Sequence, residues 1–284
     1  MALQEGSVVV VTGAASGIGE GLARECSERG FRLALADIEG PALDSLAREL
    51  EAGGAVVTAV PTDVSEPSSV AAFATQVERD FGVPALVLAN AGVIGPALPL
   101  WQQPATEWEW TWRVNVLGVV NTWSAFLPAM IDRGTGHVAA TSSVAGLAPG
   151  QSAGNAPYAA SKYGIVALAD NLRVELAEVA PDLLVTVLLP GPVKSRIRQA
   201  TRNRPPEFGG PETQPMPAVD PFPTRLEADE FALSAMDGLQ QGVRYLMPNA
   251  DFVEPVAQHV ERVAAELRRD NSWNPGVRDP GSRG

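Results

Sequence analysis

The stretch VVVVTGAASGIGEGLA, residues 8–23, constrains the fold of this chain more than any other. Four valines form a stiff apolar run that favours a buried strand, and glycines at 13, 17 and 19 lead directly into a helix-like run. A strand that turns at once into a helix directs the free N–H groups of the helix toward the turn. A diphosphate can approach them only where side chains are absent. The pattern therefore predicts a nucleotide site, the alternative being a helix start with incidental glycines.

The same alternation continues along the chain. The short apolar runs predicted as strands are Ser7–Thr12, Arg32–Ala36, Val56–Pro61, Leu86–Ala89, His137–Ser142, Leu184–Leu189 and Arg244–Met247. The longer amphipathic runs predicted as helices are Gly17–Arg29, Pro41–Ala52, Pro67–Asp80, Thr106–Arg133, Tyr158–Val179 and Glu227–Gln241. The strand runs alternate little, as expected when helices cover both faces of a sheet. We predict an α/β fold with a doubly wound, seven-stranded parallel sheet, in one domain over residues 1–284 with its core at 7–247.

Composition excludes several classes of partner. The chain has 284 residues, 45% of them hydrophobic, and a net charge of -12, which disfavours nucleic acid and anionic membranes. The N-terminus has no signal-peptide pattern, and no uninterrupted apolar run approaches the roughly 18 residues of a membrane span. Cys26 is the single cysteine, and His137 and His259 are too few and too far apart to predict a metal site. We expect a soluble, cytoplasmic protein whose ligand is a small molecule.

One segment interrupts the alternation. Residues 201–225, within a loop over 198–225, hold seven of the 24 prolines, and proline neither extends a helix nor donates to a sheet. The segment follows the last long core strand at its carboxyl end, where ligands bind in such folds. We interpret it as a lid on the substrate side, with a disordered loop as the alternative. A C-terminal helix and a frayed tail are expected over 252–284.

Asp37 ends the second predicted strand, 20 residues after Gly17. An acidic side chain at this position accepts hydrogen bonds from the adenine ribose hydroxyls and repels a 2′-phosphate. Neither Ala14–Ser16 nor Ile38–Gly40 contains a basic residue that would bind such a phosphate. Asp37 therefore predicts a preference for NAD over NADP, unless it only caps a turn.

Six short motifs occur in a fixed order. They are TGAASGIG from Thr12, TDVS from Thr62, NAG from Asn90, NVLG from Asn115, SSVAG from Ser142 and YAASK from Tyr158. With these motifs the chain resembles the short-chain dehydrogenase/reductase family, in its compact branch with the glycine spacing G-x-x-x-G-x-G. The resemblance covers about residues 7–247. It implies a Rossmann fold, a nicotinamide cofactor and hydride transfer between an alcohol and a ketone.

Tyr158 and Lys162 stand at i and i+4 of a predicted helix and share one face. A phenol, with an unperturbed pKa of about 10, is a poor base at neutral pH unless a nearby positive charge favours the phenolate. Tyr158 can then take a proton from an alcohol or return it to a ketone. A serine hydroxyl at the strand end stabilises the charge on the reacting oxygen, and the match to the family favours Ser143 over Ser142.

The resemblance implies the remaining site residues. The catalytic set is Asn115, Ser143, Tyr158 and Lys162, although Asn115 could instead mark a helix kink. The implied cofactor contacts are Gly13, Ser16, Gly17, Ile18, Gly19, Asp37, Ile38, Asp63, Val64, Asn90, Ala91, Gly92, Tyr158, Lys162, Pro190, Gly191, Val193 and Ser195. The expected substrate contacts are Ser143, Val144, Leu147, Ile94 and Pro192, with Val93 also on the apolar wall. The stretch GQSAGNAP, residues 150–157, is an insertion relative to the family.

Five of the six tryptophans lie between Trp101 and Trp123. Trp108 and Trp112 have helical i, i+4 spacing, which favours core or subunit packing, whereas Trp101 precedes the helix and is a candidate for the pocket. The helices Thr106–Arg133 and Tyr158–Val179 correspond to the dimer face of the family. We therefore expect a homodimer or homotetramer.

The apolar pocket predicts an apolar or aromatic secondary alcohol. Residues 194–210 and the run after Leu226 resemble the members that oxidise lignin-type aromatic alcohols. Two other readings stay open: an NADPH-type 3-oxoacyl reductase, which Asp37 disfavours, and a non-catalytic NAD-binding scaffold, which the complete catalytic set disfavours.

Overall fold

The computed structural model describes residues 3–148, 154–211 and 225–270. Its centre is a seven-stranded parallel sheet in the order β3-β2-β1-β4-β5-β6-β7. The strands are β1 (Val8–Thr12), β2 (Arg32–Asp37), β3 (Val57–Pro61), β4 (Leu86–Ala89), β5 (Thr135–Thr141), β6 (Asp182–Leu188) and β7 (Tyr245–Leu246). All seven predicted strands are present, and the predicted fold class is confirmed.

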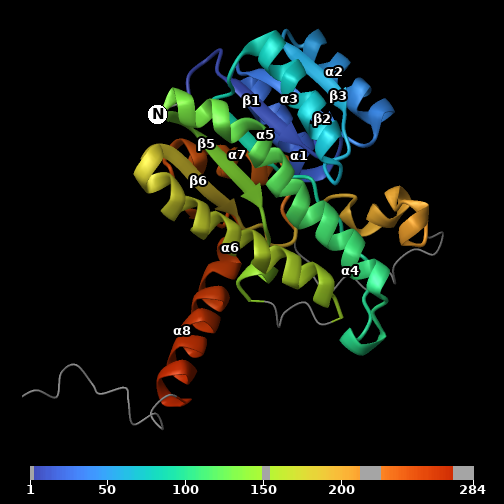
Figure 1. Ribbon diagram of the computed structural model, residues 1–284, viewed down its shortest axis with the longest axis vertical. Coiled ribbons are helices and arrows are strands. Elements are labelled where there is room, and N and C mark those ends of the chain that lie inside the picture. Colours follow the sequence, from blue (N-terminus) through green and yellow to red (C-terminus); the bar gives the residue numbers. More distant parts are fainter. Residues whose placement is uncertain (1–2, 149–153, 212–224, 271–284) are drawn as a thin grey trace, which may run out of the picture.

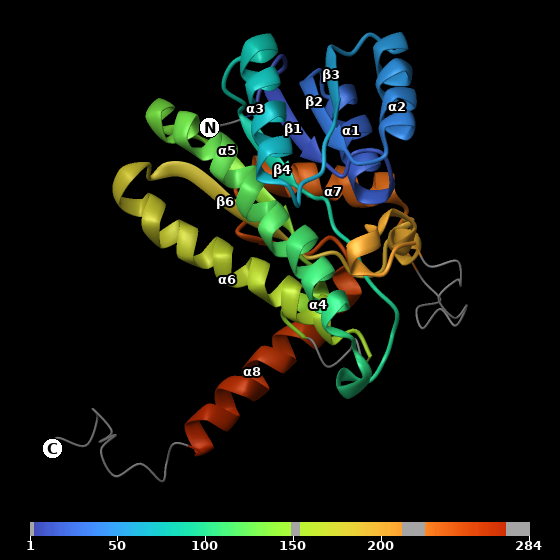
Figure 2. The ribbon, with the colours of Figure 1, turned by 45° about the vertical axis from the view of Figure 1, so that its right-hand side comes forward.

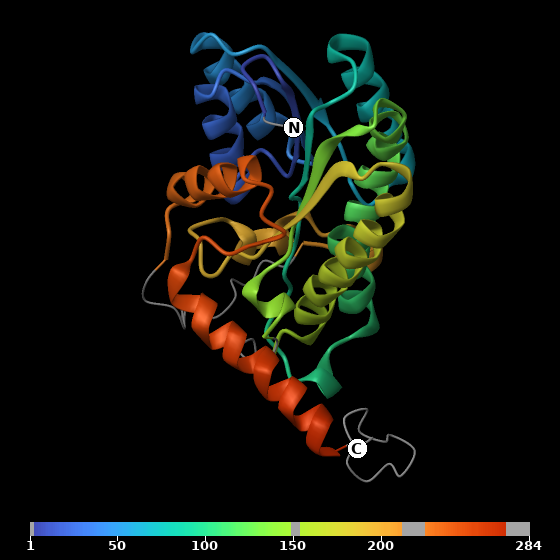
Figure 3. The ribbon, with the colours of Figure 1, turned by 90° about the vertical axis from the view of Figure 1, so that its left-hand side faces the viewer.

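Apart from the last helix, the helices form two layers, one on each face of the sheet (Figures 1 and 3). They are α1 (Gly17–Glu28), α2 (Gly40–Ala52), α3 (Pro67–Phe81), α4 (Ala105–Trp112), α5 (Gly118–Arg133), α6 (Ala156–Val179), α7 (Ala228–Gln240) and α8 (Val253–Asp270). One apolar core lies between the sheet and α1, α2 and α7, and a second lies between the sheet and α3, α5 and α6. Because both faces are covered, alternate residues along a strand such as β1 enter different cores, and the strand is apolar throughout.

The strand order reverses beside β1. This strand pairs with β2 on one side and β4 on the other, so the chain winds outward in both directions from that point. The loops that follow β1 and β4 separate there and leave a crevice at the carboxyl edge of the sheet. This topology places the candidate site.

The predicted helix Thr106–Arg133 is divided into two helices. A π-helical turn, Arg113–Leu117, joins α4 to α5, and Asn115 lies at its centre. Both ends of the Asn115 side-chain amide bond the backbone of Val93, on the loop after β4. These contacts accompany the local widening of the helix, a feature that is frequent at functional sites.

Within the described residues, the stretch Ala105–Arg133 is long and apolar enough, by length and composition, to cross a membrane. Polar residues interrupt it, so it contains no uninterrupted apolar run of that length. Trp123 and Phe126, on α5, are buried in the second core. The apolarity of α5 therefore serves packing against the sheet and its neighbouring helices.

The segment predicted as a proline-rich loop contains short helical turns. Residues Ile197–Asn203 and Pro206–Phe208 form 3₁₀ turns beside the crevice, while 212–224 lie outside the described residues. Half of the predicted insertion, residues 150–153, is also outside them, and 154–157 lead into α6. The predicted C-terminal helix is α8, which extends away from the body of the molecule in Figure 2, and the predicted tail beyond it is not described.

Candidate active site

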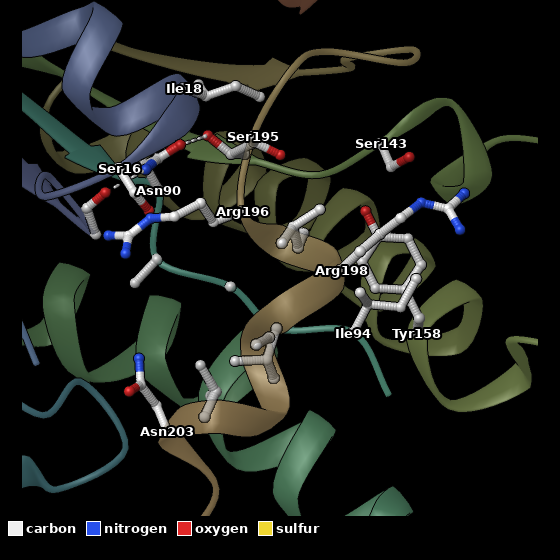
Figure 4. Close-up of a pocket in the computed structure, with 18 of the residues that line it drawn as sticks. Ser16, Ile18, Asn90, Ile94, Ser143, Tyr158, Ser195, Arg196, Arg198 and Asn203 are labelled. Carbon is white, nitrogen blue, oxygen red and sulfur yellow. Dashed lines mark hydrogen bonds between the residues drawn. The ribbon is translucent and has the colours of Figure 1, made fainter. Parts of the chain in front are cut away.

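The crevice is a cavity of about 530 Å³ at the carboxyl edge of the sheet. Asp37 and Ile38 line one end, and Ser143, Tyr158 and Lys162 line the other. Figure 4 shows Ser16 and Ile18 on one side of the cavity and Ser143 and Tyr158 on the opposite side. The turn Ile197–Asn203 lies between them, so a ligand that joins both ends passes beside this turn.

The glycine turn is fixed by close packing. A Cβ on Gly13, where φ is +66°, would lie 2.7 Å from the Cα of Ala91, and a Cβ on Gly19 would lie 2.0 Å from the carbonyl oxygen of Gly13. The glycines therefore let the β1 and β4 loops approach each other and let α1 begin directly behind the turn. Ser16, the N-cap of α1, makes no side-chain cap hydrogen bond and lines the cavity. This free helix end suits a diphosphate, so the turn fits a dinucleotide.

Asp37 is held at the end of β2 by two backbone hydrogen bonds. Its Oδ2 accepts from the N–H of Ala15 at 2.8 Å, and its Oδ1 accepts from the N–H of Glu39 at 2.9 Å. A carboxylate offers about four acceptor sites, so two remain for a ligand. The carboxylate therefore connects the glycine turn to the loop after β2, and it can still receive hydroxyl groups.

Two arginines reach this end of the cavity from a remote part of the chain. Arg196 and Arg202 form ion pairs with Glu39 at 2.8 and 2.5 Å, and Asn203 donates to the same carboxylate at 2.7 Å. Burial alone would raise the pKa of Glu39, but these hydrogen bonds and charges lower it below the usual value. Sequence inspection around Asp37 missed the arginines because only tertiary contacts bring them there.

The two adjacent serines after β5 point to different partners. Ser142 donates to the carbonyl of Lys162, inside α6, at 2.6 Å. Ser143 accepts from the N–H of Ala145 at 3.2 Å and donates to the carbonyl oxygen of Pro190 at 3.4 Å. Both serines border the cavity, but the hydroxyl of Ser143 is the one that faces the tyrosine.

Tyr158 and Lys162 lie one turn apart on α6, and the Nζ of Lys162 is 5.6 Å from the centre of the tyrosine ring. Burial raises the pKa of Tyr158 above its ordinary value, and the hydrogen bond to Ser143 lowers it in part. Burial also lowers the pKa of Lys162 to about 7. Desolvation thus outweighs the hydrogen bond, and the expected lowering of the Tyr158 pKa by a nearby positive charge does not arise from the side chains of this chain alone.

Asn115 and Lys162 surround Gly92. The Asn115 amide also donates to Ser161 at 2.9 Å, which ties the π turn to α6. A Cβ on Gly92 would lie 3.1 Å from the Nζ of Lys162 and 3.3 Å from the Oδ1 of Asn115. The sequence left a helix kink and a role in the site as alternatives for Asn115. In the structure Asn115 lies in the π turn and also beside Gly92, which lines the cavity.

Residues 7–206 match the short chain dehydrogenase family. The chain belongs to this family. It is 34% identical over 276 residues to 1-deoxy-11-beta-hydroxypentalenate dehydrogenase of Streptomyces avermitilis, covering 94% of this chain and 93% of the relative. It is 27% identical over 277 residues to the C alpha-dehydrogenase of Sphingobium sp. strain SYK-6, covering 95% and 90%. The structure of a short-chain dehydrogenase/reductase from Burkholderia phymatum in complex with NAD superposes with a TM-score of 0.86 at 30% identity, covering 94% of this chain and 97% of that one.

Family membership makes the chain an oxidoreductase that binds a nicotinamide cofactor. Most of the residues that the resemblance implied lie together in the cavity. Those that line it are Gly13, Ser16, Ile18, Asp37, Ile38, Asp63, Val64, Asn90, Ala91, Gly92, Ile94, Ser143, Val144, Tyr158, Lys162, Pro190, Gly191, Pro192, Val193 and Ser195.

Four of the site residues that the family resemblance implied do not line the cavity. Asn115 and Gly19 are buried behind the wall of the cavity, and Gly17 lines a neighbouring hollow beside Ser195. Leu147, expected to contact substrate, is not part of the lining and packs against the second core. The short 3₁₀ turn Val144–Gly146 explains the difference, because it directs Val144 to the cavity and carries the chain away from it.

The burial of the tryptophans matches the sequence prediction only in part. Trp101 is 82% exposed and outside the cavity lining, so it does not fill the predicted pocket role. Trp108 is half-buried and Trp112 is 41% exposed, so neither is fully buried in the core, and their packing against a second subunit stays a prediction. Trp110, which sequence reasoning did not select, is 2% exposed, lines the cavity and packs with Ala200 and Phe208. The cluster depends on the turns after Ile197, and no sequence signal places those turns against α4.

Proposed function

We propose that the protein is an NAD-dependent oxidoreductase that interconverts a secondary alcohol and a ketone, with Tyr158 as the general acid and base. The observation that carries the proposal is the placement of the Tyr158 and Ser143 side chains together on one side of the cavity (Figure 4). Beside them, Lys162 donates a hydrogen bond to Thr141, and Asn115 accepts one from the N–H of Val93. A binding module has no need of this arrangement.

In the oxidation direction, Tyr158 takes the hydroxyl proton of the alcohol at its phenolic oxygen. Ser143 donates a hydrogen bond to the same substrate oxygen and fixes its position. The nicotinamide ring, when bound, supplies the hydride acceptor. Because burial raises the pKa of Tyr158, the phenolate requires positive charge nearby, and protonated Lys162 is the protein group that provides it. In reduction, Tyr158 returns the proton to the carbonyl oxygen.

The preference for NAD rests on Asp37 and Glu39. The Asp37 carboxylate keeps two acceptor sites for ribose hydroxyls and repels a 2′-phosphate. Arg196 and Arg202 could attract such a phosphate, but Glu39 already binds both. With both arginines engaged by Glu39, the Asp37 carboxylate therefore favours the non-phosphorylated cofactor.

The cavity beside Tyr158 supports an apolar substrate body. Ile94, Val144 and Trp110 line it, and the side chains of the cluster around Phe208 extend the apolar wall. Two of the relatives are named for a hydroxypentalenate and for a Cα position. By analogy we propose a cyclic or aryl secondary alcohol.

We further propose a cytoplasmic homo-oligomer. Cys26 is buried as a free thiol, which suits a reducing compartment. On the outer side of α6, Val174 is 72% exposed and Tyr163 is also exposed, while Trp112 lies beside Gly164. This apolar strip supports an interface between two copies. Val174→Glu should shift the sedimenting species toward monomer, and an unchanged sedimentation coefficient would place the interface elsewhere.

The enzymatic proposal is tested by NADH formation at 340 nm across aliphatic, steroid and aryl secondary alcohols, with NAD⁺ and NADP⁺ in parallel. Tyr158→Phe should lower kcat by about 10² to 10⁴-fold while NADH fluorescence still reports binding. A panel without turnover, in a protein that binds NADH, would favour the scaffold reading. Turnover restricted to NADP⁺ would contradict the argument from Asp37.

A further inference from the structure

The charge inside the cavity is opposite to that of the whole molecule. The chain carries a net charge of -12. The charged residues that line the cavity are nevertheless six bases, Arg113, Lys162, Arg196, Arg198, Arg202 and Arg225, and two acids, Asp37 and Asp63. A basic lining in an acidic protein indicates that the cavity receives negative charge.

Several of these bases already have partners. Arg196 and Arg202 pair with Glu39, and the Nζ of Lys162 donates to the carbonyl of Thr141. Arg113 lies 3.7 Å from Glu66 and 5.5 Å from the centre of the Phe208 ring. Arg198 differs, because no carboxylate of the described residues lies within ion-pairing distance of its guanidinium.

Arg198 is located on the reactive side of the cavity. Its side chain extends from the turn Ile197–Asn203 toward Ser143 and Tyr158, next to Ile94 (Figure 4). Ser16 and Ile18, at the glycine turn, lie on the other side of the same view. The side chain of Arg198 is therefore directed away from the helix end that suits a diphosphate and toward the groups that suit a substrate oxygen.

A half-buried guanidinium beside apolar walls has lost part of its hydration. A carboxylate compensates this loss best, because the planar fork of arginine donates two parallel hydrogen bonds to it. Trp110 and Phe208 supply an apolar surface in the same cavity. The cavity thus presents a hydroxyl pair, an apolar wall and a cation to one ligand.

We propose that Arg198 binds a carboxylate on the substrate, so that the enzyme acts on hydroxy or oxo carboxylic acids with an apolar body between the two polar ends. This inference rests on the proposed oxidoreductase function and narrows its substrate class. Hydride and proton leave the carbinol end, whereas the carboxylate end stays unchanged and fixes the orientation of the substrate. Arg198 is therefore a specificity-determining residue with no part in the proton transfer.

The test uses matched acids and methyl esters. The full-length protein is assayed with 4-(1-hydroxyethyl)benzoate and 3-hydroxycyclohexanecarboxylate, each beside its methyl ester. We expect kcat/KM to favour the acids, and Arg198→Met to lower the acid-to-ester ratio by about 100-fold, the scale of a lost buried charge pair. Arg79→Met is the control, because Arg79 is an exposed arginine beside Asp80 on α3 and far from the cavity lining. It should leave the ratio as in the wild type.

Two further measurements distinguish a failure of the carboxylate inference from a failure of the proposed oxidoreductase function. Binding of 4-acetylbenzoate and its methyl ester to the protein–NADH complex is followed by calorimetry, which needs no turnover. Acid binding that Arg198→Met abolishes would support the carboxylate site even if no alcohol were oxidised, and only the proposed function would then fail. Equal binding and turnover of acid and ester would overturn the inference. So would an Arg198→Met variant that loses NADH affinity, since Arg198 would then serve the cofactor diphosphate.

Discussion

The buried side chain of Lys162 donates a hydrogen bond of 2.8 Å to the carbonyl oxygen of Thr141, the last residue of β5. This bond fixes the ammonium at the wall of the active site and couples α6 to β5. Burial lowers the pKa of Lys162 to about 7, so its charge state near neutral pH depends on the charges brought into the cavity. The charged form of Lys162 therefore lowers the stability of the fold, because it is buried, and supports catalysis, because it favours the phenolate of Tyr158.

Removing Lys162 should change the pH dependence of stability. The folded-state pKa lies below that of the unfolded chain, so between pH 7 and about 10 the unfolded state binds more protons. Burial of the charged Lys162 lowers the unfolding free energy most strongly below pH 7. This destabilisation decreases as the pH rises, by at most about 1.4 kcal/mol per pH unit. Urea unfolding of the wild type and Lys162→Met at pH 6.5 to 8.5 measures it. The advantage of the variant should shrink with rising pH, and a constant difference would refute the shifted pKa.

The two serines after β5 provide a matched pair of variants. Ser143→Ala should lower kcat/KM by about 10² to 10³-fold, because it removes a hydrogen bond to the developing oxyanion. Ser142→Ala should change kcat/KM little and lower the unfolding free energy by about 1 kcal/mol, since it removes the bond to the Lys162 carbonyl. Steady-state kinetics and urea unfolding of both variants decide the assignment. The reverse pattern would make Ser142 the substrate partner.

Charge removal at Asp37 should weaken the cofactor preference. Asp37→Asn keeps an acceptor for the Ala15 N–H but no longer repels a 2′-phosphate. We expect the NAD⁺-to-NADP⁺ ratio of kcat/KM to fall at least about tenfold, corresponding to about 1.4 kcal/mol. Asp37→Ala should in addition lower the melting temperature, because the Ala15 N–H loses its partner. An unchanged ratio in both variants would assign Asp37 to the loop alone.

Glu39 should control the two arginines beside Asp37. Glu39→Gln removes the negative charge that binds Arg196 and Arg202 and leaves them available to a phosphate. The KM for NADP⁺ should therefore decrease relative to that for NAD⁺, with a stability loss below about 1 kcal/mol for these partly exposed pairs. Asp237→Asn, which disrupts the surface pair with Arg29, is the control. Equal effects of the two variants on the KM ratio would contradict a local role of Glu39.

Local sequence was sufficient for the parts of the site that lie at fixed places in a strand–helix unit. The apolar run before Gly13 predicted β1, the glycines predicted the close approach behind it, and Asp37 follows from the end of β2. The i, i+4 spacing of Tyr158 and Lys162 predicted their common face, because 3.6 residues per turn fix it whatever the rest of the chain does.

Only the tertiary structure decided which side chains complete the cavity. Arg196 meets Glu39 across 157 residues of sequence, Trp110 packs with Phe208 of a distant turn, and Leu147 turns away from the cavity. No periodicity or spacing in the sequence predicts these features. The contacts of Arg196 and Phe208 depend on how the segment after β6 folds back over the crevice. Sequence therefore determined the sheet, the glycine turn and the reactive pair, whereas long-range packing determined the charge and the shape that a substrate meets.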